Sequence, residues 1–315
     1  MKFSDLPQVP IRPHSFFSLD SMEVAVRLPK RPTPIRIHCK SAGDGPPLLL
    51  IHGLMTSGYS FRYIVPALSE RYQVIIPDLP GAGRSEAPVD LSMSPQSIAQ
   101  FISCLISALH IESPYVVGNS LGGYQSLWFA ILFSGQVRKL IIMHAPGFAQ
   151  FRLSAMRFIV DSRGGRALAR RLMCWNPERF VAQNIHYHDP SIMSREEAQE
   201  YGSIFRDQDR TEVFFRILRE SLDPDAMREL IEHLSAIRNG KGILPSVRLF
   251  WARQDAIVPP AFGLKYQELL PTAELVWFDQ ASHFLQVDDP ERTVREIVRF
   301  DSSSSNSGRS LPESS

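Results

Sequence analysis

The sequence predicts an α/β protein whose mainly parallel sheet is covered by helices on both faces, with a helical cap inserted between two of its strands. Two observations carry this prediction. Short uninterrupted apolar runs alternate along the chain with helical patterns, as they do in parallel sheets built from strand–helix–strand units. The interval 147–242 breaks the alternation, because it is rich in helical patterns and contains no convincing buried strand.

The predicted strands follow one another in order. Residues 15–27 and 35–40 hold short β-branched and apolar runs on either side of a Pro-rich turn at 29–34, which favours an opening hairpin or two edge strands. Six later runs are almost wholly apolar, as strands covered on both faces are: 48–51, 72–77, 115–117, 137–143, 247–251 and 275–278. Helical patterns lie between these runs, at 59–71, 95–110, 121–133, 261–270 and 290–300.

These elements divide the chain into a core domain of residues 1–146 and 243–300 and a cap of residues 147–242. Within the core, residues 1–13 are expected to form an irregular arm. Residues 301–315 consist mostly of Ser, Asn, Gly and Pro, a composition that cannot bury enough apolar surface to fold, so we expect a disordered tail.

Composition narrows the class of protein. The apolar fraction of 44% and the charged fraction of 21% are ordinary for a globular protein, and the net charge of +1 gives no reason to expect a nucleic-acid partner. Residues 1–14 contain no apolar segment of the kind found in secretory signals, and no run of about 18 apolar residues predicts a membrane span. Three cysteines form no disulfide framework. We therefore expect a cytoplasmic protein.

The strongest catalytic signal is the pentapeptide Gly-Asn-Ser-Leu-Gly at 118–122. It follows the apolar run at 115–117 and opens the helical pattern at 121–133, which is the context of a G-x-S-x-G nucleophile elbow. The alternative is a loop that merely contains glycine and serine, but such a loop does not account for the strand before it and the helix after it. Ser120 is therefore predicted to be a nucleophile.

A serine hydroxyl needs a base, and the base needs a carboxylate to fix its tautomer. His283 lies between the last predicted strand and the last predicted helix, where this architecture places the base. Asp255 follows the strand at 247–251 and lies between serine and histidine in chain order, so it is predicted to be the acid. Asp279 is the rival carboxylate, and we expect it to shape the loop before His283 instead.

The developing oxyanion also needs donors. One is the backbone N–H of Leu121, directly after the nucleophile, and the second is the N–H of Leu54 in the loop after the run at 48–51. His52, which opens that loop, is expected to be a structural hydrogen-bonding residue. His188 and Asp189 are expected to form a surface turn, so the sequence predicts neither a metal nor a cofactor.

Taken in order, these motifs resemble the cap-bearing members of the α/β-hydrolase family. The resemblance spans roughly residues 35 to 300 and adds a D-x-P-G-x-G-x-S turn at 78–85 to the elements above. It implies an α/β-hydrolase fold, with a mostly parallel, doubly covered sheet and a helical cap insertion. It also implies an esterase- or lipase-like serine hydrolase that works through an acyl-enzyme. The similar epoxide hydrolases and haloalkane dehalogenases use an aspartate where this chain has Ser120.

Two other functions stay open. The elbow at 118–123 also resembles that of bacterial carbon–carbon bond hydrolases that cleave ring-fission products, although their Gly-rich oxyanion loop is replaced here by Leu-Met-Thr-Ser-Gly at 54–58. A binding protein that kept the fold and lost catalysis is the third possibility, and the intact Ser120, Asp255 and His283 argue against it.

The cap is expected to exclude water and to provide an apolar pocket for a small ester-like substrate. Three residues are predicted to contact that substrate: His144 at the end of a core strand, Trp175 in the cap, and Phe284 beside the base. His144 is equally compatible with a buried wall position. The sequence gives no indication of the oligomeric state.

The cap also has a local excess of positive charge. Between residues 152 and 179, Asp161 and Glu178 are the only acidic residues. The same segment contains seven arginines: Arg152, Arg157, Arg163, Arg166, Arg170, Arg171 and Arg179. The excess could meet an acidic substrate, a carrier protein or a membrane surface. A solvated helix face is the simpler interpretation.

Overall fold

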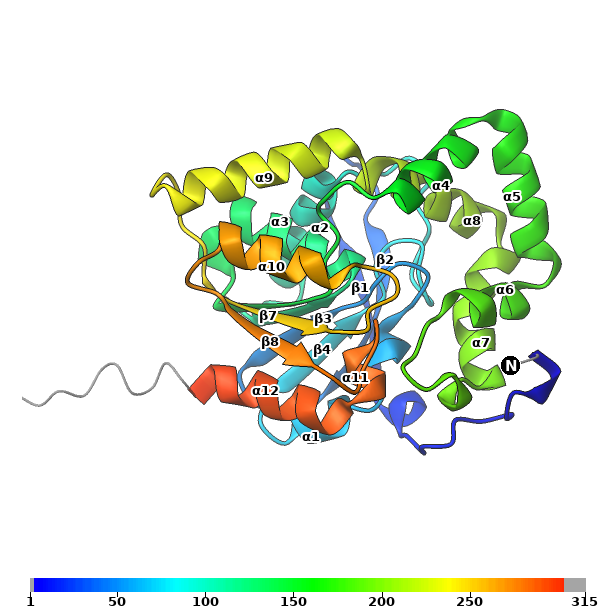
Figure 1. Cartoon of the computed structure of the whole chain (residues 1–315), viewed down its shortest axis with the longest axis horizontal. Helices are drawn as coiled ribbons and strands as arrows, with labels where there is room; N and C mark the ends of the chain where they lie inside the picture. The colour runs from blue at the N-terminus through cyan, green and yellow to red at the C-terminus, as the bar shows by residue number, and fades with distance from the viewer. Residues whose placement is uncertain (1–2, 303–315) are drawn as a thin grey trace, which may run out of the picture.

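The computed structural model describes residues 3–302, which fold around one eight-stranded sheet with the order β1-β2-β4-β3-β5-β6-β7-β8 (Figure 1). The strands are β1 (Asp20–Val26), β2 (Ile35–Ala42), β3 (Pro47–Ile51), β4 (Gln73–Pro77), β5 (Tyr115–Asn119), β6 (Lys139–Met143), β7 (Ser246–Ala252) and β8 (Glu274–Phe278). Each of the eight predicted runs forms a strand, which confirms the predicted fold class.

The pairing explains why the runs look as they do in the sequence. β2 pairs antiparallel with β1 and with β4, so the predicted opening hairpin is present. All other neighbours pair in parallel. β5 and β6 lie in the middle of the sheet and are buried along their whole length, whereas β1, at the edge, is exposed at most positions. Central strands have no solvent face, so their sequences lose the polar alternation of edge strands.

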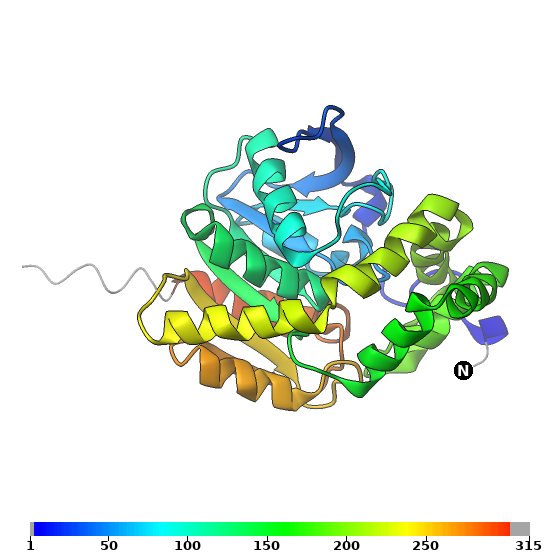
Figure 2. The same ribbon diagram turned by 90° about the horizontal axis from the view of Figure 1, so that it is seen from above.

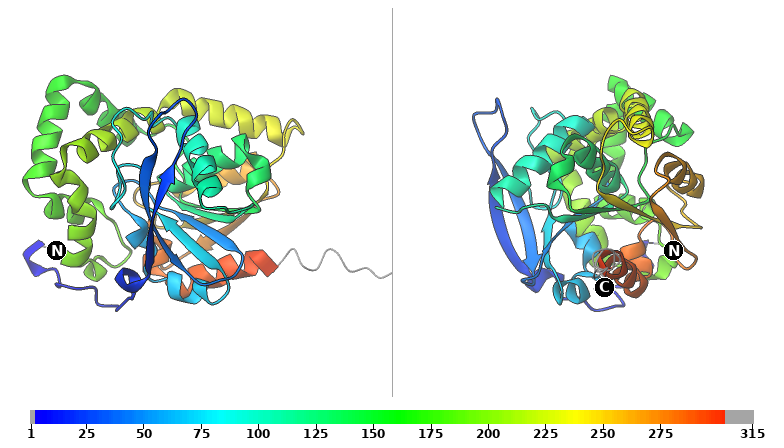
Figure 3. Two further views of the ribbon diagram at one scale, coloured as in Figure 1. Left: turned by 180° about the vertical axis from the view of Figure 1, so that it is seen from behind. Right: turned by 90° about the vertical axis from the view of Figure 1, so that its left-hand side faces the viewer.

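Helices cover both faces of the sheet (Figures 1 and 3). On one face lie α2 (Pro95–Ala108), α3 (Leu121–Leu132), α9 (Pro224–Arg238) and α10 (Pro260–Leu269). On the other lie α1 (Val65–Ser69) and α12 (Pro290–Ser302), with the short α11 (Leu285–Asp288) before α12.

Two predicted boundaries were wrong. The helix expected at 59–71 is a 3₁₀ turn, Gly58–Phe61, followed by the short α1, because Pro66 lacks an N–H and cannot sit inside a longer helix. The tail expected from residue 301 is wrong at its first two residues, because α12 continues to Ser302 and Asp301 accepts hydrogen bonds from the hydroxyls of Tyr72 and Tyr115. The remainder of the predicted tail lies outside the described residues.

The cap stands to one side of the core (Figure 2). It comprises α4 (Phe151–Asp161), α5 (Arg163–Trp175), α6 (Pro177–Asn184), α7 (Arg195–Gly202) and α8 (Gln208–Arg216), followed by a π-helical turn, Ile217–Ser221. The predicted interval 147–242 also contains α9, and this helix packs on the core. Its Leu230 and Leu234 are fully buried, and its His233 meets Trp128 of α3 edge to face.

A buried charge pair joins the cap to the core. The guanidinium of Arg62, just before α1, lies 3.0 Å from a carboxylate oxygen of Glu197 in α7, and neither side chain reaches solvent. The hydroxyl of Tyr187 donates to the same carboxylate, and the Arg62 guanidinium lies 4.4 Å from the centre of the Tyr59 ring. Ring stacking and the tyrosine hydroxyl offset part of the cost of taking this pair out of water, although Nε of Arg62 and the second carboxylate oxygen of Glu197 have no hydrogen-bond partner among residues 3–302.

The N-terminal arm predicted at 1–13 is irregular over its described residues, apart from a 3₁₀ turn at Phe3–Asp5. A second 3₁₀ turn, Phe16–Ser18, occupies the start of the run predicted as a strand at 15–27. The arm lies along the cap, where its backbone oxygens accept hydrogen bonds from the first residues of α7. The three cysteines are all free thiols. Among residues 3–302, no helix is both long and apolar enough to cross a membrane.

Candidate active site

Ser120 occupies a strained turn between β5 and α3. Its φ of 55° and ψ of −122° are unusual for a residue with a side chain, and its N–H donates to the carbonyl of Met143 at 2.7 Å. The flanking glycines make the turn possible. A Cβ at Gly118 would lie 2.5 Å from the Gly122 carbonyl oxygen, and one at Gly122 would lie 2.3 Å from the Ile51 carbonyl oxygen. The motif therefore forms the strained strand–turn–helix that the sequence predicted around Ser120.

The predicted acid and base are in contact. His283 Nδ1 lies 2.9 Å from one carboxylate oxygen of Asp255 and 3.1 Å from the other. The loop after β7 fixes the carboxylate, since the backbone N–H groups of Ile257 and Val258 donate to it at 2.7 and 3.0 Å. An aspartate held this way orients the imidazole opposite it.

The electrostatics of the pair set its tautomer. Burial alone would raise the pKa of Asp255, but the neighbouring His283 and His144 and the hydrogen bonds outweigh it and lower the pKa to about 2. The carboxylate is therefore ionised and can only accept hydrogen bonds. Nδ1 of His283 must carry the proton, which leaves the lone pair of Nε2 available as a base.

The rival carboxylate, Asp279, points away from this pair. Its side chain is 65% exposed and forms an ion pair with Arg253, at 2.9 Å. This arrangement favours Asp255 as the partner of His283.

Ser120 and His283 line one cavity of about 130 Å³ between the core and the cap. Its lining is mostly apolar, and on the cap side it consists of Gln150, Leu153, Met156, Phe180, Asn184, Ile185, Phe214 and Leu222. No hydrogen bond joins the Ser120 hydroxyl to the imidazole among the described contacts. A contact of this kind commonly tightens only when substrate binds.

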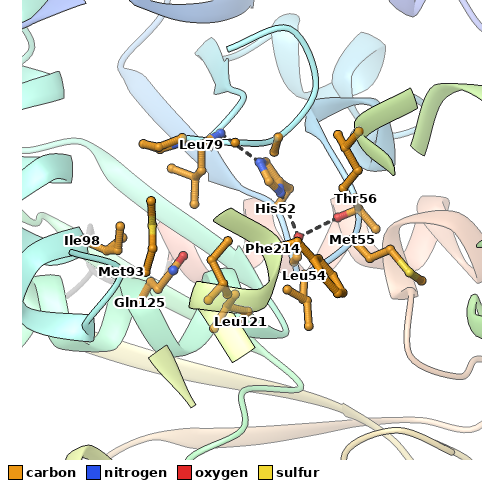
Figure 4. A pocket seen from close by; sticks show the side chains of 16 residues that line it. His52, Leu54, Met55, Thr56, Leu79, Met93, Ile98, Leu121, Gln125 and Phe214 are labelled. Carbon is orange, nitrogen blue, oxygen red and sulfur yellow. Dashed lines mark hydrogen bonds between the residues drawn. The ribbon is translucent and has the colours of Figure 1, made fainter. Parts of the chain in front are cut away.

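The predicted oxyanion donors belong to residues on the wall of the same cavity. Leu121 begins α3 directly after the nucleophile, and Leu54 lies in the loop after β3. His52 holds this loop in place, because Nδ1 donates to the Gly53 carbonyl and Nε2 accepts from the Leu79 N–H, each at 2.9 Å. Figure 4 shows the ring between the two segments, beside a second cavity of about 30 Å³. The structural role expected for His52 is confirmed.

His144 does not line the cavity, which argues against the predicted substrate contact and favours the buried, hydrogen-bonded position that the sequence also allowed. Its side chain is fully buried behind the base, with its ring centre 5.3 Å from that of His283. Nε2 accepts the N–H of Ala252 at 2.8 Å, and burial lowers the pKa of His144 to about 4, so the ring is neutral. A neutral ring in this position supports the orientation of His283.

Of the other two residues predicted to contact the substrate, one lines the cavity and one does not. Phe284 lines the cavity and meets the His283 ring edge to face, with the ring centres 5.2 Å apart. Trp175 is 79% exposed at the end of α5 and is not among the lining residues. The prediction for Trp175 assumed that an aromatic residue in the cap faces inward, and here the helix turns it outward.

The structure also adds a residue that the sequence analysis passed over. The amide of Asn119, inside the elbow, donates to the backbone carbonyl of His283 at 3.2 Å. Its oxygen accepts from the amide of Gln286 at 3.4 Å. Asn119 therefore connects the turn of Ser120 to the loop of His283. Its position inside the predicted motif was the sequence signal that could have pointed to it.

Among residues 3–302, one group of potential metal ligands has donor atoms within 4.8 Å of one another: His144, Asp255 and His283. The lone pair of His144 Nε2 is already occupied by the N–H of Ala252, and the proton of a neutral ring then resides on Nδ1. His144 therefore has no lone pair to offer, and hydrogen bonding explains this group better than metal binding.

Comparison with known proteins gives the family. The model of the alpha/beta hydrolase fold family matches residues 46–290, so the chain belongs to that family. The family supports a hydrolase activity on small molecules.

Among curated proteins, the chain is 29% identical over 272 residues to 2-hydroxy-6-oxo-6-phenylhexa-2,4-dienoate hydrolase of Burkholderia cepacia. The match covers 84% of this chain and 91% of that protein. It is 25% identical over 258 residues to the uncharacterized hydrolase YugF of Bacillus subtilis, covering 80% and 89%.

Solved structures show the same fold at low identity. The epoxide hydrolase CorEH matches with a TM-score of 0.74 at 20% identity, over 90% of this chain and 99% of that one. A meta-cleavage product hydrolase from Pseudomonas fluorescens IP01 matches with a TM-score of 0.69 at 22% identity, over 91% and 99%. At such identities the likeness shows the fold alone.

Proposed function

We propose that this chain is a serine hydrolase that cleaves a carboxylic ester or thioester of a largely apolar small molecule. One observation carries the proposal: an ionised, buried Asp255 contacts His283, and that imidazole shares an apolar cavity with the strained Ser120. The proposal includes the cytoplasmic location expected from the sequence, with which the free cysteines agree.

In the proposed reaction, His283 Nε2 takes the proton of the Ser120 hydroxyl as the oxygen attacks the substrate carbonyl. The N–H groups of Leu54 and Leu121 hold the oxyanion, and the imidazolium protonates the leaving alkoxide or thiolate. Water activated by the same imidazole then attacks the acyl-enzyme. The acid product leaves, and Ser120 recovers its proton.

The charge of the cavity bears on the choice between ester and carbon–carbon cleavage. The dienoates in the printed names of several relatives carry a carboxylate. A buried carboxylate needs a cationic or hydrogen-bonding partner. Among the described residues that line this cavity there is no Lys or Arg, and the side chains of Gln150 and Asn184 supply the amide N–H donors. A lining without a cation suits a neutral, apolar acyl group better than a dienoate.

The test of the nucleophile is labelling by a fluorophosphonate probe. The wild-type chain should label, and Ser120→Ala should lose labelling and about 10⁶-fold in ester turnover. Ser134→Ala, just after α3 and outside the cavity lining, is the matched control and should keep both. Labelling retained by Ser120→Ala would refute the assignment, and a wild-type chain that neither labels nor turns over esters would indicate a binding protein.

The test of the substrate is a series of p-nitrophenyl esters from acetyl upward, measured as kcat/KM. Each methylene buried in the transition state contributes about 0.8 kcal/mol, so kcat/KM should rise up to about fourfold per carbon until the cavity is full. A steady fall from acetyl onward would contradict an apolar acyl site. Labelling without any ester turnover would favour carbon–carbon cleavage, and a vinylogous ring-fission diketone would then be the substrate to assay.

A further inference from the structure

A second, smaller cavity adjoins the one that holds Ser120. Its volume is about 30 Å³, and it shares five lining residues with the larger cavity: Gly53, Leu54, Met55, Leu121 and Phe214. Leu54 and Leu121 are the residues whose N–H groups are proposed to hold the oxyanion. The smaller cavity therefore lies beside the place where the carbonyl of a substrate would react.

Gln125 is the unusual residue in the wall of this smaller cavity. It lies in α3, five residues after Ser120, and it is only 2% exposed. Its amide oxygen has no hydrogen-bond partner among residues 3–302. Figure 4 shows its side chain on the wall of the cavity, together with the apolar side chains of Met93, Ile98 and Leu121.

The other polar side chains of the described wall already have partners. Both ring nitrogens of His52 are hydrogen-bonded, and the Thr56 hydroxyl donates to the Gly53 carbonyl at 3.0 Å. A buried amide oxygen without a partner costs free energy. A methionine of similar length and helix propensity would avoid that cost at Gln125. A ligand that bonds to the amide would account for the glutamine.

We propose that the smaller cavity binds a hydroxyl or carbonyl group on the acyl chain of the substrate, with Gln125 as its hydrogen-bonding partner. A half-turn about its last torsion lets the amide present either its oxygen or its N–H groups, so it can bond to a donor or to an acceptor. A volume of about 30 Å³ exceeds the need of one water molecule and has room for about two heavy atoms.

The position of the base assigns this group to the acyl half of the substrate. His283 must face the leaving group in order to protonate it. His283 and Ser120 line the larger cavity and are absent from the described wall of the smaller one. A substituent in the smaller cavity therefore points away from the leaving group, while the rest of the acyl chain stays in the larger, apolar cavity.

This inference rests on the proposed function and narrows its substrate class to an ester or thioester of a hydroxy- or oxo-acid. Because the smaller cavity is short and borders the oxyanion donors, the polar group should lie on one of the first few carbons of the acyl chain. The larger, apolar cavity accounts for the apolar remainder of that chain.

The test compares ethyl esters of one six-carbon acyl chain by the release of acid, measured as kcat/KM. The chain is unsubstituted, or carries a hydroxyl on carbon 2 or 3, or an oxo group on carbon 3, 4 or 5. Each value is divided by the rate constant of that ester in alkaline hydrolysis, which removes differences in intrinsic reactivity. With the wild-type chain, one position should exceed the unsubstituted ester by about tenfold.

Two variants isolate the amide. Gln125→Met should lose this preference, so that the corrected ratio falls about tenfold. Gln136→Met is the matched control, because its amide oxygen also lacks a partner among residues 3–302 but lies outside both cavities. It should keep the preference. A wild-type chain that prefers no position, or a preference that survives in Gln125→Met, would overturn the proposal.

Thermal unfolding gives a readout that needs no turnover. Gln125→Met should raise the midpoint by a few degrees, because it removes an unpaired buried amide. A lower midpoint would mean that the amide is bonded within the folded chain and would count against the proposal. The two proposals also fail differently. Turnover of the unsubstituted ester without any preference would remove only the role of Gln125, whereas no turnover of any ester would contradict the proposed function itself.

Discussion

Asp255 and Glu197 are both carboxylates removed from water, yet the structure around each favours a different role. Asp255 contacts an imidazole that can gain and lose a proton and that faces the cavity of Ser120. Glu197 contacts Arg62, and neither residue of that pair lines this cavity. Burial alone would lower the pKa of Arg62, but Glu197 and the surrounding phenols raise it, so the guanidinium keeps its proton.

The comparison teaches that a buried charge does not by itself indicate catalysis. What distinguishes the two sites is the partner of the carboxylate, because an imidazole can accept and return a proton during turnover, whereas a guanidinium only donates hydrogen bonds. The four predictions below test whether the two carboxylates divide function and stability in this way.

The largest effect is expected at the acid of the proposed triad. Asp255→Asn should reduce kcat by about 10⁴-fold, since an amide stabilises the wrong tautomer of His283. The measurement is ester turnover, with circular dichroism to show that the fold is kept. A loss of less than tenfold would mean that the Asp255 carboxylate is not needed for the reaction.

Glu197→Gln should have the opposite profile. Removing one partner of a buried ion pair leaves the other charge uncompensated, so the free energy of unfolding should fall by about 3–5 kcal/mol. Turnover per folded molecule should change little. Urea unfolding measures the loss, and Arg62→Met combined with Glu197→Leu should recover much of it, because an apolar pair leaves no buried charge. Unchanged stability in Glu197→Gln would break the comparison.

The pH dependence of stability should separate the two carboxylates again. The pKa of Asp255 is about 2 in the folded chain, below its usual 3.8. The folded state therefore favours the ionised form. The resulting stabilisation, about 2 kcal/mol, is present above pH 3.8 and is lost as the pH falls through 2.

Unfolding free energies measured from pH 2 to pH 5 check this. In Asp255→Asn, the free energy of unfolding should not show this loss as the pH falls. In Glu197→Gln, the loss should remain. If Asp255→Asn shows the same pH profile as the wild type, the low pKa is not a property of Asp255.

The smallest effect is expected at the rival carboxylate. Asp279 forms an exposed ion pair with Arg253, and such pairs contribute little to stability. Asp279→Asn should therefore change the free energy of unfolding by less than about 0.5 kcal/mol and turnover by only a few-fold. A larger loss of turnover than in Asp255→Asn would reverse the assignment of the acid.

Much of the core could be predicted because its strands are central and parallel. β5 and β6 have no solvent face, so their sequences are uninterrupted apolar runs, and chain order then places the turns that follow them at one edge of the sheet. The pairing of His283 with Asp255 follows from that edge. The role of Asn119 was harder to predict, because it depends on contact with a loop 164 residues away in the sequence.

The cap could not be predicted in the same detail, because the sequence does not decide which face of each cap helix points toward the core. α5 contains apolar residues on two faces, and only packing decides that Met173 points inward while Trp175 points outward. α9 looked like part of the cap for a related reason. Its apolar residues, Leu230 and Leu234 among them, would suit either layer, and the fold places them on the core.

The ring of His52 uses both of its nitrogens, one as donor and one as acceptor, to hold the loop of Leu54 against the segment at Leu79. Only one tautomer of the uncharged ring satisfies both bonds. If Nε2 also carried a proton, its N–H would point at the Leu79 N–H, and neither donor would have an acceptor. Burial lowers the pKa of His52 and so protects this arrangement at ordinary pH. The loop of Leu54 therefore has its own limit of acid tolerance, independent of the histidine that would carry out the chemistry.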